Sequence, residues 1–260
     1  MEWWQSLGIG LLCLLVGAVL GPLVQPWSRR IERLGRRLWR ERPVSVHIEW
    51  DQAVIWAGQP PWVSFSNYFQ GDLPSEDPPV AGVDWSRWAE RNGGFDLGLT
   101  MLRVTVFAET DATVVLETPI VRGTTRDVPP GVGVLWPAPG GADLSPRRYS
   151  IQLDSGPYPA RVTYMEQDPG VDPPQVPPTW TLARGEVAQL HIWAKADTGG
   201  LHVWTMQLPL LIDGRRRLVD VDKDGRPFMT VGRHHGHRDL MWRDGHFIEP
   251  PDWAAPEAQS

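Results

Sequence analysis

The sequence predicts an all-β protein: an antiparallel immunoglobulin-like β-sandwich preceded by one N-terminal transmembrane helix. After residue 43, short runs of alternating apolar and polar residues are separated by turn residues, and the chain holds 26 glycines and 26 prolines among 260 residues. The first 27 residues contain one long apolar stretch instead. We therefore expect a transmembrane anchor at 1–27, a basic amphipathic juxtamembrane segment at 28–43, the sandwich at 44–232 and a histidine-containing tail at 233–260.

The anchor is predicted from an uncharged stretch between residues 3 and 27, of which residues 7–24 are strongly apolar. About 20 apolar residues cross the hydrocarbon core of a bilayer. Trp3, Trp4 and Trp27 lie where aromatic side chains gather at the two membrane interfaces. A cleaved signal peptide would carry positive charge before the apolar run, whereas this chain begins MEWWQS. An uncleaved, single-pass anchor is therefore predicted.

The segment after the anchor is strongly basic, with seven arginines and two glutamates in residues 28–42. Apolar residues recur there at helical spacing, which is typical of an amphipathic helix lying on anionic lipid headgroups. The arginines assigned to the membrane interface are Arg29, Arg30, Arg33, Arg36 and Arg37. A plain stop-transfer role for the same charges stays open. No Lys or Arg precedes the span, so the charge bias predicts a cell-membrane protein with a cytoplasmic C-terminal domain.

The net charge of −6 conceals a more acidic domain. Residues 28–42 contribute +5 and Glu2 contributes −1, which leaves −10 for residues 43–260. Nucleic acid is therefore not an expected partner, since phosphate contacts require a positive surface. The single cysteine, Cys13, lies within the apolar run, so no internal disulfide can form, which is more typical of a reducing compartment.

Residues 44–232 read as short strands joined by turns. Residues 44–50 alternate, with Val44, Val46, Ile48 and Trp50 on one face. Further strands are predicted in WVSFSNYF, GLTMLRVTVFAE, ATVVLETPIVR, RRYSIQL, ARVTYME, VAQLHIWAKA, LHVWTMQLPLLI, RRLVDV and RPFMTV, and a short helix or irregular turn in DWSRWAERNGG. Hairpins are predicted across Thr110-Asp111 and, with the strongest turn signal, across Asp213-Gly214.

The run DVDKDG matches the first six positions of an EF-hand calcium loop through Asp220, Asp222 and Asp224. The match then fails, because the position that should supply a bidentate glutamate is Val231. We interpret the run as the tight turn of a β-hairpin, and weak calcium binding at that turn stays open.

Three histidines near the C-terminus, His234, His235 and His237, are ligand types that suit a divalent metal. A metal site needs such ligands held rigidly, and here they are expected in a polar tail beyond the last strand. We interpret them as an adventitious metal-binding tail, with a functional site as the alternative.

Catalytic motifs do not emerge from the sequence. It contains no G-x-S-x-G elbow, no P-loop and no G-x-G-x-x-G after a strand. We therefore expect no catalytic residue, no cofactor and no enzymatic activity. A pair of carboxylates assembled from distant positions stays open.

Seven of the fifteen tryptophans fall into two groups. Trp50, Trp193 and Trp204 alternate with polar residues in strands and are predicted to fill the core. A second group lies near glycine or proline turns: Trp62, Trp85, Trp88 and Trp136. We expect these rings to pack into the core or anchor loops, and an exposed stacking platform for a sugar or peptide is the alternative.

Four stretches, LHVWTMQLPLLIDGRRR, DVDKDGRPFMTVG, MWRDGHFIEP and WSRWAERNGGFDLGLTMLRVTVFAET, carry a resemblance. In them the chain resembles a group of uncharacterised actinobacterial single-pass membrane-anchored β-sandwich proteins. The resemblance covers most of the chain after the anchor. It implies a β-sandwich and no assigned function.

These patterns favour a membrane-tethered, non-catalytic interaction or scaffold module that presents edge strands and acidic loops to a protein partner at the inner membrane face. The alternative is an extracytoplasmic carbohydrate- or calcium-dependent binding domain, which the arginines after the span oppose. A metal-dependent hydrolase using the C-terminal histidines is a third reading.

Overall fold

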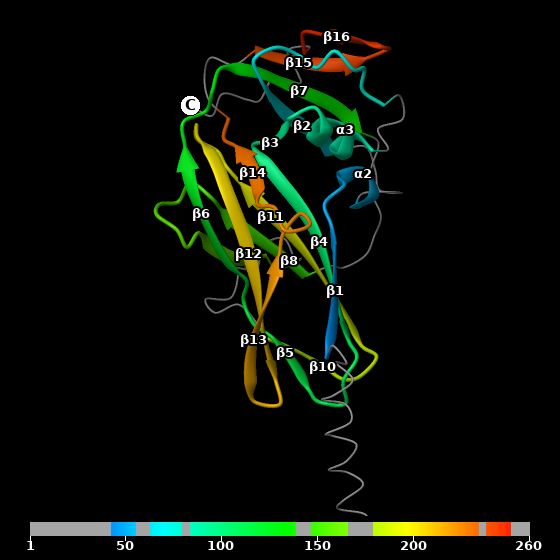
Figure 1. Ribbon diagram of the computed structural model, residues 1–260, viewed down its shortest axis with the longest axis vertical. Coiled ribbons are helices and arrows are strands. Elements are labelled where there is room, and N and C mark those ends of the chain that lie inside the picture. Colours follow the sequence, from blue (N-terminus) through cyan, green and yellow to red (C-terminus); the bar gives the residue numbers. More distant parts are fainter. Residues whose placement is uncertain are drawn as a thin grey trace, which may run out of the picture. The chain divides into compact units, whose positions relative to one another are not determined.

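The computed structural model describes residues 43–55, 63–79, 84–138, 147–165, 179–233 and 238–250, and it confirms an all-β fold (Figure 1). The anchor, the basic segment and His234, His235 and His237 lie outside these residues, as do Trp3, Trp4, Trp27 and Arg29, Arg30, Arg33, Arg36 and Arg37. Among the described residues, no helix is both long and apolar enough to cross a membrane.

One sheet has five strands in the order β1-β4-β11-β8-β9. Its members are β1 (Val44–Glu49), β4 (Leu99–Ala108), β8 (Arg147–Gln152), β9 (Arg161–Met165) and β11 (Val187–Lys195). Residues 44–50 behave as their alternation predicts, because Val44, Val46, Ile48 and Trp50 all pack against the core. We call this sheet A.

The other sheet, sheet B, follows the order β10-β5-β12-β14-β3-β2-β7-β15-β16, with β6 and β13 also paired to β12. Its first members are β2 (Val63–Gln70), β3 (Phe95–Leu97), β5 (Val114–Leu116), β6 (Ile120–Arg126), β7 (Gly131–Ala138) and β10 (Trp180–Leu182). The remaining members are β12 (Leu201–Ile212), β13 (Arg215–Val221), β14 (Phe228–Val231), β15 (Arg238–Arg243) and β16 (His246–Ile248).

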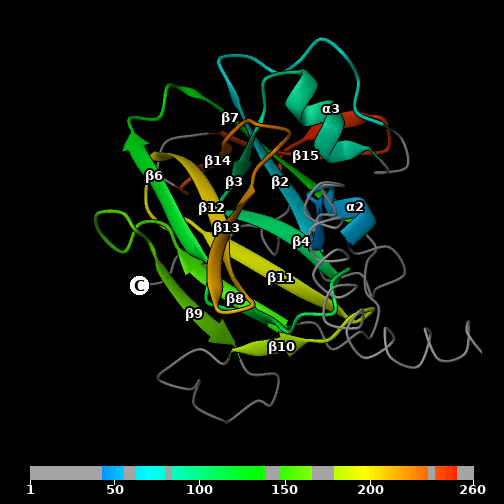
Figure 2. The ribbon, with the colours of Figure 1, turned by 60° about the horizontal axis from the view of Figure 1, so that its bottom comes forward.

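The main core lies between sheet A and the part of sheet B around β12 (Figure 2). Leu102, Val104, Val106 and Ala108 are all buried, as the alternation in β4 predicts. The facing side chains of β12 alternate in the same way and are also buried: Trp204, Met206, Leu208, Leu210 and Ile212. Burial of both apolar faces against each other holds the two sheets together as a sandwich.

A second, smaller core lies near β2, β7 and β15, the strands at the top of Figure 1. It contains two short helices, α2 (Gln52–Ile55) and α3 (Trp85–Arg91). Trp85 and Trp88 from α3 are fully buried there, and their ring centroids lie 5.0 Å apart. Met101 of β4 joins this second core, whereas its neighbour Leu102 joins the main one. The N-terminal end of β4 is therefore covered on both faces.

The tryptophan predictions have mixed outcomes. Trp204 is buried, and Trp50 and Trp193 are partly buried against the two cores. Burial of Trp85 and Trp88 confirms packing and excludes these two rings from a stacking platform. The Trp62 residue and the Trp136 side chain lie outside the described part of the structure.

The predicted hairpin across Thr110-Asp111 is wrong. β4 belongs to sheet A, where β1 and β11 occupy both of its edges, while β5 pairs with β10 and β12 in sheet B. The chain therefore crosses between sheets at this point. Alternation shows that each stretch is a strand but does not show which strand is its partner.

The hairpin across Asp213-Gly214 is confirmed. Both residues have positive φ, 49° and 71°, and Ile212 pairs with Arg215 across the turn. Aspartate followed by glycine tolerates this left-handed pair, whose twist matches that of the flanking strands.

The run DVDKDG forms a tight turn but not the hairpin that was predicted. Lys223 and Arg226 exchange backbone hydrogen bonds of 2.9 and 3.1 Å around Asp224-Gly225. The flanking strands β13 and β14 do not pair with each other; both pair with β12, one after the other. The turn therefore joins two strands that pair with successive parts of β12.

Sheet B continues beyond residue 232, the predicted end of the domain. β15 and β16 lie beyond it, and β15 continues sheet B by pairing with β7. Asp244-Gly245, with φ of 51° and 82°, closes this added hairpin. The pairings β8 with β11, β3 with β14 and β7 with β15 are parallel, so the sandwich is not purely antiparallel as predicted.

Candidate ligand pocket at the sheet corner

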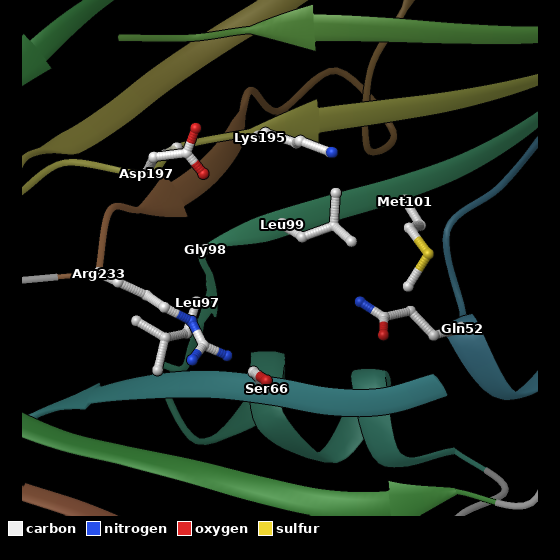
Figure 3. Close-up of a pocket in the computed structure, with 10 residues that line it drawn as sticks. Gln52, Ser66, Leu97, Gly98, Leu99, Met101, Lys195, Asp197 and Arg233 are labelled. Carbon is white, nitrogen blue, oxygen red and sulfur yellow. The ribbon is translucent and has the colours of Figure 1, made fainter. Parts of the chain in front are cut away.

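A cavity of about 250 Å³ opens where one stretch of chain passes from sheet B to sheet A (Figure 3). Strand β3 ends at Leu97 in sheet B, and β4 begins at Leu99 in sheet A. Its lining comes from four strands, from the loops beside them and from α2: Gln52, Ser66, Leu97, Gly98, Leu99, Met101, Lys195, Ala196, Asp197 and Arg233. We call this cavity the corner pocket.

Gly98 makes the corner possible. Its φ of +76° is a left-handed conformation that side chains with a Cβ rarely adopt. Its N–H donates to the Val231 carbonyl at 2.7 Å, and its carbonyl accepts from the Ala196 N–H at 2.9 Å. The corner is thus bonded to sheet B on one side and to the end of β11 on the other. A Cβ at this position would also lie 3.1 Å from Nε of Arg233.

Two cationic side chains, Lys195 and Arg233, line the pocket (Figure 3). Within the described part of the chain, neither forms an ion pair, whereas other arginines do, such as Arg216 with Glu117 at 2.9 Å. The acidic lining residue is Asp197, whose Oδ2 accepts a hydrogen bond of 2.6 Å from the Gln152 amide. The charged groups of the lining therefore sum to one positive charge.

Gln52 supplies an amide from α2. The residue is only 4% exposed, and its side-chain amide is directed into the pocket (Figure 3). Its backbone N–H donates to the Ser86 hydroxyl at 3.2 Å, which ties α2 to α3. Its Oε1 is buried without a hydrogen-bond partner among the residues that the structure describes. Such a group is costly to bury, and a bound molecule or water in the pocket would complete its bonding.

The loop that carries Asp197 is held by Asp154. Oδ2 of Asp154 accepts from the backbone N–H groups of Asp197 and Thr198 at 2.9 and 2.8 Å and from the Thr198 hydroxyl at 3.0 Å. Burial acts to raise the pKa of Asp154, but the hydrogen bonds from Gln152, Thr198 and Asp197 together outweigh it and lower that pKa. The carboxylate is therefore a stable anchor for this loop.

The loop that carries Arg233 is fixed by close backbone contact. Gly232 donates its N–H to the Gly200 carbonyl at 2.8 Å, and a Cβ on Gly232 would overlap the Thr198 carbonyl. The loops that carry Asp197 and Arg233 are thus bonded to each other. The pocket is preformed rather than assembled from free loops.

Behind the pocket lies a chain of buried hydrogen bonds. The Trp204 indole donates to the Thr230 hydroxyl at 2.9 Å, that hydroxyl lies 2.7 Å from the Thr100 hydroxyl, and Thr100 donates to Asp96 at 2.6 Å. Burial raises the pKa of Asp96, although Lys223 and the Thr100 hydrogen bond oppose it. This chain links β3, β4, β14 and β12, and its members Asp96 and Thr100 adjoin the lining residues Leu97 and Leu99 in the sequence.

The predicted calcium residues do not converge on a point. Asp220 accepts from the Gln207 amide at 2.9 Å, Asp222 accepts from the Gly225 N–H at 2.8 Å, and Asp224 adopts a positive φ within the turn. No group of three or more His, Cys, Asp or Glu side chains in the described ranges could hold a metal ion.

Sequence reasoning missed the corner pocket. Its residues come from positions 52 to 233 and share no motif. The signal that was available is Gly98, a glycine inside an otherwise regular strand pattern, which often marks a bend or a close approach of backbone.

No protein-family model and no curated protein matches the chain. Among solved structures, the chain is similar to the X-ray structure of Northeast Structural Genomics Consortium target SoR45, at 11% identity over 76% of this chain and 97% of that chain. The TM-score is 0.21, so this likeness carries no argument about fold or function.

Proposed function

We propose that the chain is a membrane-tethered, non-catalytic binding module, with an N-terminal span and an immunoglobulin-like sandwich on the cytoplasmic side. The observation that carries the proposal is the corner pocket, which is preformed and lined by two cations without ion pairs in the described chain and by a buried amide. Lysine, arginine and amide groups at fixed positions bind and orient a ligand. These pocket groups support a ligand-binding function. The apolar stretch at residues 7–24 supports the membrane tether.

The tether is tested by fractionating cells that express the full chain with a reporter fused after Ser260. We expect the chain to sediment with membranes and to be released by detergent but not by alkaline carbonate, with the reporter active in the cytoplasm. Replacing Leu14 and Leu15 by arginine should release most of the chain, because charge in the middle of a span costs several kcal/mol. A carbonate-soluble chain contradicts the tether, and an external reporter contradicts the orientation.

A second candidate function, binding of a protein partner through an added strand, is favoured by an exposed apolar pair on sheet A. Phe107 and Val187 are opposite each other in neighbouring strands and are 39% and 54% exposed. Phe107 also faces Ser45 of β1, the edge strand of the sheet, which pairs only with β4 among the described strands. An extended apolar segment of a partner fits such an edge, since backbone bonds and alternate side chains are both offered.

Photo-crosslinking tests this second candidate in native membranes. A photoreactive phenylalanine at position 45, which is exposed on the edge strand β1 opposite Phe107, should give a discrete adduct with one other protein. The same group at Leu218, another exposed apolar side chain at 47% exposure, serves as the matched control. Adducts of equal yield and pattern from both positions would show non-specific exposure and contradict a partner at this edge.

A further inference from the structure

We propose that the corner pocket binds a carboxylate joined to a short apolar group. This inference rests on the proposed binding function and names the class of ligand. The lining supplies what each half of such a ligand requires.

The charged half is matched by donors from three different elements. Arg233 offers a planar guanidinium that can bond both oxygens of a carboxylate, and Lys195 offers a point charge from the end of β11. The Gln52 amide is directed into the same space (Figure 3). Its Nε2 can donate to a carboxylate oxygen, whereas Oε1 is an acceptor and would bond a water rather than the carboxylate. Because no ion pair within the described chain engages either cation, a bound carboxylate would not have to displace an existing one.

The apolar half is matched by three side chains on the β3–β4 stretch, Leu97, Leu99 and Met101. Leu97 and Met101 are nearly fully buried, at 2% and 4% exposure, and Leu99 is partly exposed, so Leu99 presents the larger apolar surface to a ligand. A volume of about 250 Å³ equals that of roughly eight water molecules in the liquid, at about 30 Å³ each. A carboxylate with a branched chain of a few carbons fits within it.

Asp197 limits the charge of the ligand. Its carboxylate, held by the Gln152 amide, lines the same pocket as the two cations, so a second negative charge on a ligand would meet repulsion. A monocarboxylate is therefore preferred over a dicarboxylate. The group can come from a free short-chain acid or from the terminal carboxylate of a peptide ending in an apolar residue.

The test follows the methyl resonance of Met101 in the full chain, purified in detergent and labelled with ¹³C-methyl methionine. Met101 lines the pocket, and the core residue Met206 reports on the fold. Isovalerate should shift the Met101 signal saturably and leave Met206 unchanged. Isovaleramide, which has nearly the same shape without the charge, should bind about tenfold more weakly, as should glutarate.

Variants assign the effect to the cations. Arg233→Gln and Lys195→Gln should each weaken isovalerate binding about tenfold and leave isovaleramide binding nearly unchanged. Arg215→Gln, an exposed arginine on β13, is the control and should leave both unchanged. An unaltered Met206 signal shows that a variant is folded. If Arg233→Gln does not fold, Lys195→Gln still tests the role of the cations. A leucine-ended peptide, compared with its amidated form, distinguishes the peptide source from the free acid.

Equal affinity for acid and amide, or no change in the cation variants, would overturn the carboxylate inference and leave the binding function standing. If isovalerate does not shift Met101, the inference is also overturned. A panel of phosphate, a monosaccharide and an alkylamine then tests whether the pocket binds any small ligand. A shift of Met101 by any of them keeps the pocket as a binding site, and no shift by any contradicts the proposed function as well.

Discussion

Replacing Trp204 by alanine is expected to lower the free energy of unfolding by about 4 kcal/mol, because it empties the largest volume in the main core. Trp204 is 1% exposed, and its ring centroid lies 4.7 Å from that of Phe228. The indole N–H also begins the buried hydrogen-bond chain through Thr230 and Thr100. The loss therefore combines a cavity with an interrupted network.

Urea unfolding of the full chain, followed by circular dichroism, measures this effect. Trp204→Phe is the matched variant. It keeps most of the apolar volume and loses the indole donor, so about 1–2 kcal/mol is expected, the usual range for one buried hydrogen bond and a small cavity. A loss below about 1.5 kcal/mol for Trp204→Ala would contradict the packing of the core. Equal losses for the two variants would show that only the hydrogen bond matters.

Acidification from pH 6.5 to pH 4 is expected to destabilise the fold by about 3 kcal/mol through His191. His191 lies in β11, directly across from Arg103 of β4 and Arg148 of β8, and is 4% exposed. Burial, followed by the charges of Arg103 and Arg148, lowers the pKa of His191 from 6.5 to about 4. His191 is thus protonated near pH 6.5 in the unfolded chain but only near pH 4 in the folded chain.

The sign of this effect follows from proton uptake. Stability is full above pH 6.5 and falls as the pH decreases toward 4, at about 1.4 kcal/mol per unit, because the unfolded state binds more protons in that window. Burial also lowers the pKa of His202, although Asp154 opposes it, so His202 adds in the same direction. The raised pKa of Asp96 acts in the opposite direction.

Comparison of wild type with His191→Gln isolates the contribution of one histidine, because Asp96 and His202 are present in both. The free energy of unfolding, measured from pH 7 to pH 4, should decline less steeply in the variant, with the difference largest near pH 4. His202→Gln, measured in parallel, gives the smaller second contribution. Parallel curves for wild type and His191→Gln would contradict the assigned role.

Local features of the fold were predictable from the sequence because they depend on near neighbours. Alternation located β1 and β4, and the Asp213-Gly214 pair defined one hairpin because its left-handed conformation is intrinsic to those residues. The same left-handed conformation occurs at Asp244-Gly245, within residues that were predicted to form a tail. The histidines and polar residues around it favoured a tail, although Asp-Gly by itself indicates a turn.

Only the tertiary structure decided which strands pair and where a binding site lies. The strand after Thr110 leaves sheet A because both edges of β4 are occupied, and no local pattern encodes that. The corner pocket depends on Gly98 turning one strand from sheet B to sheet A, which brings Gln52, Lys195 and Arg233 together from distant positions. Such convergence depends on long-range packing. The sequence by itself therefore determined the class of fold and the kinds of turns. The arrangement of the two sheets determined the site.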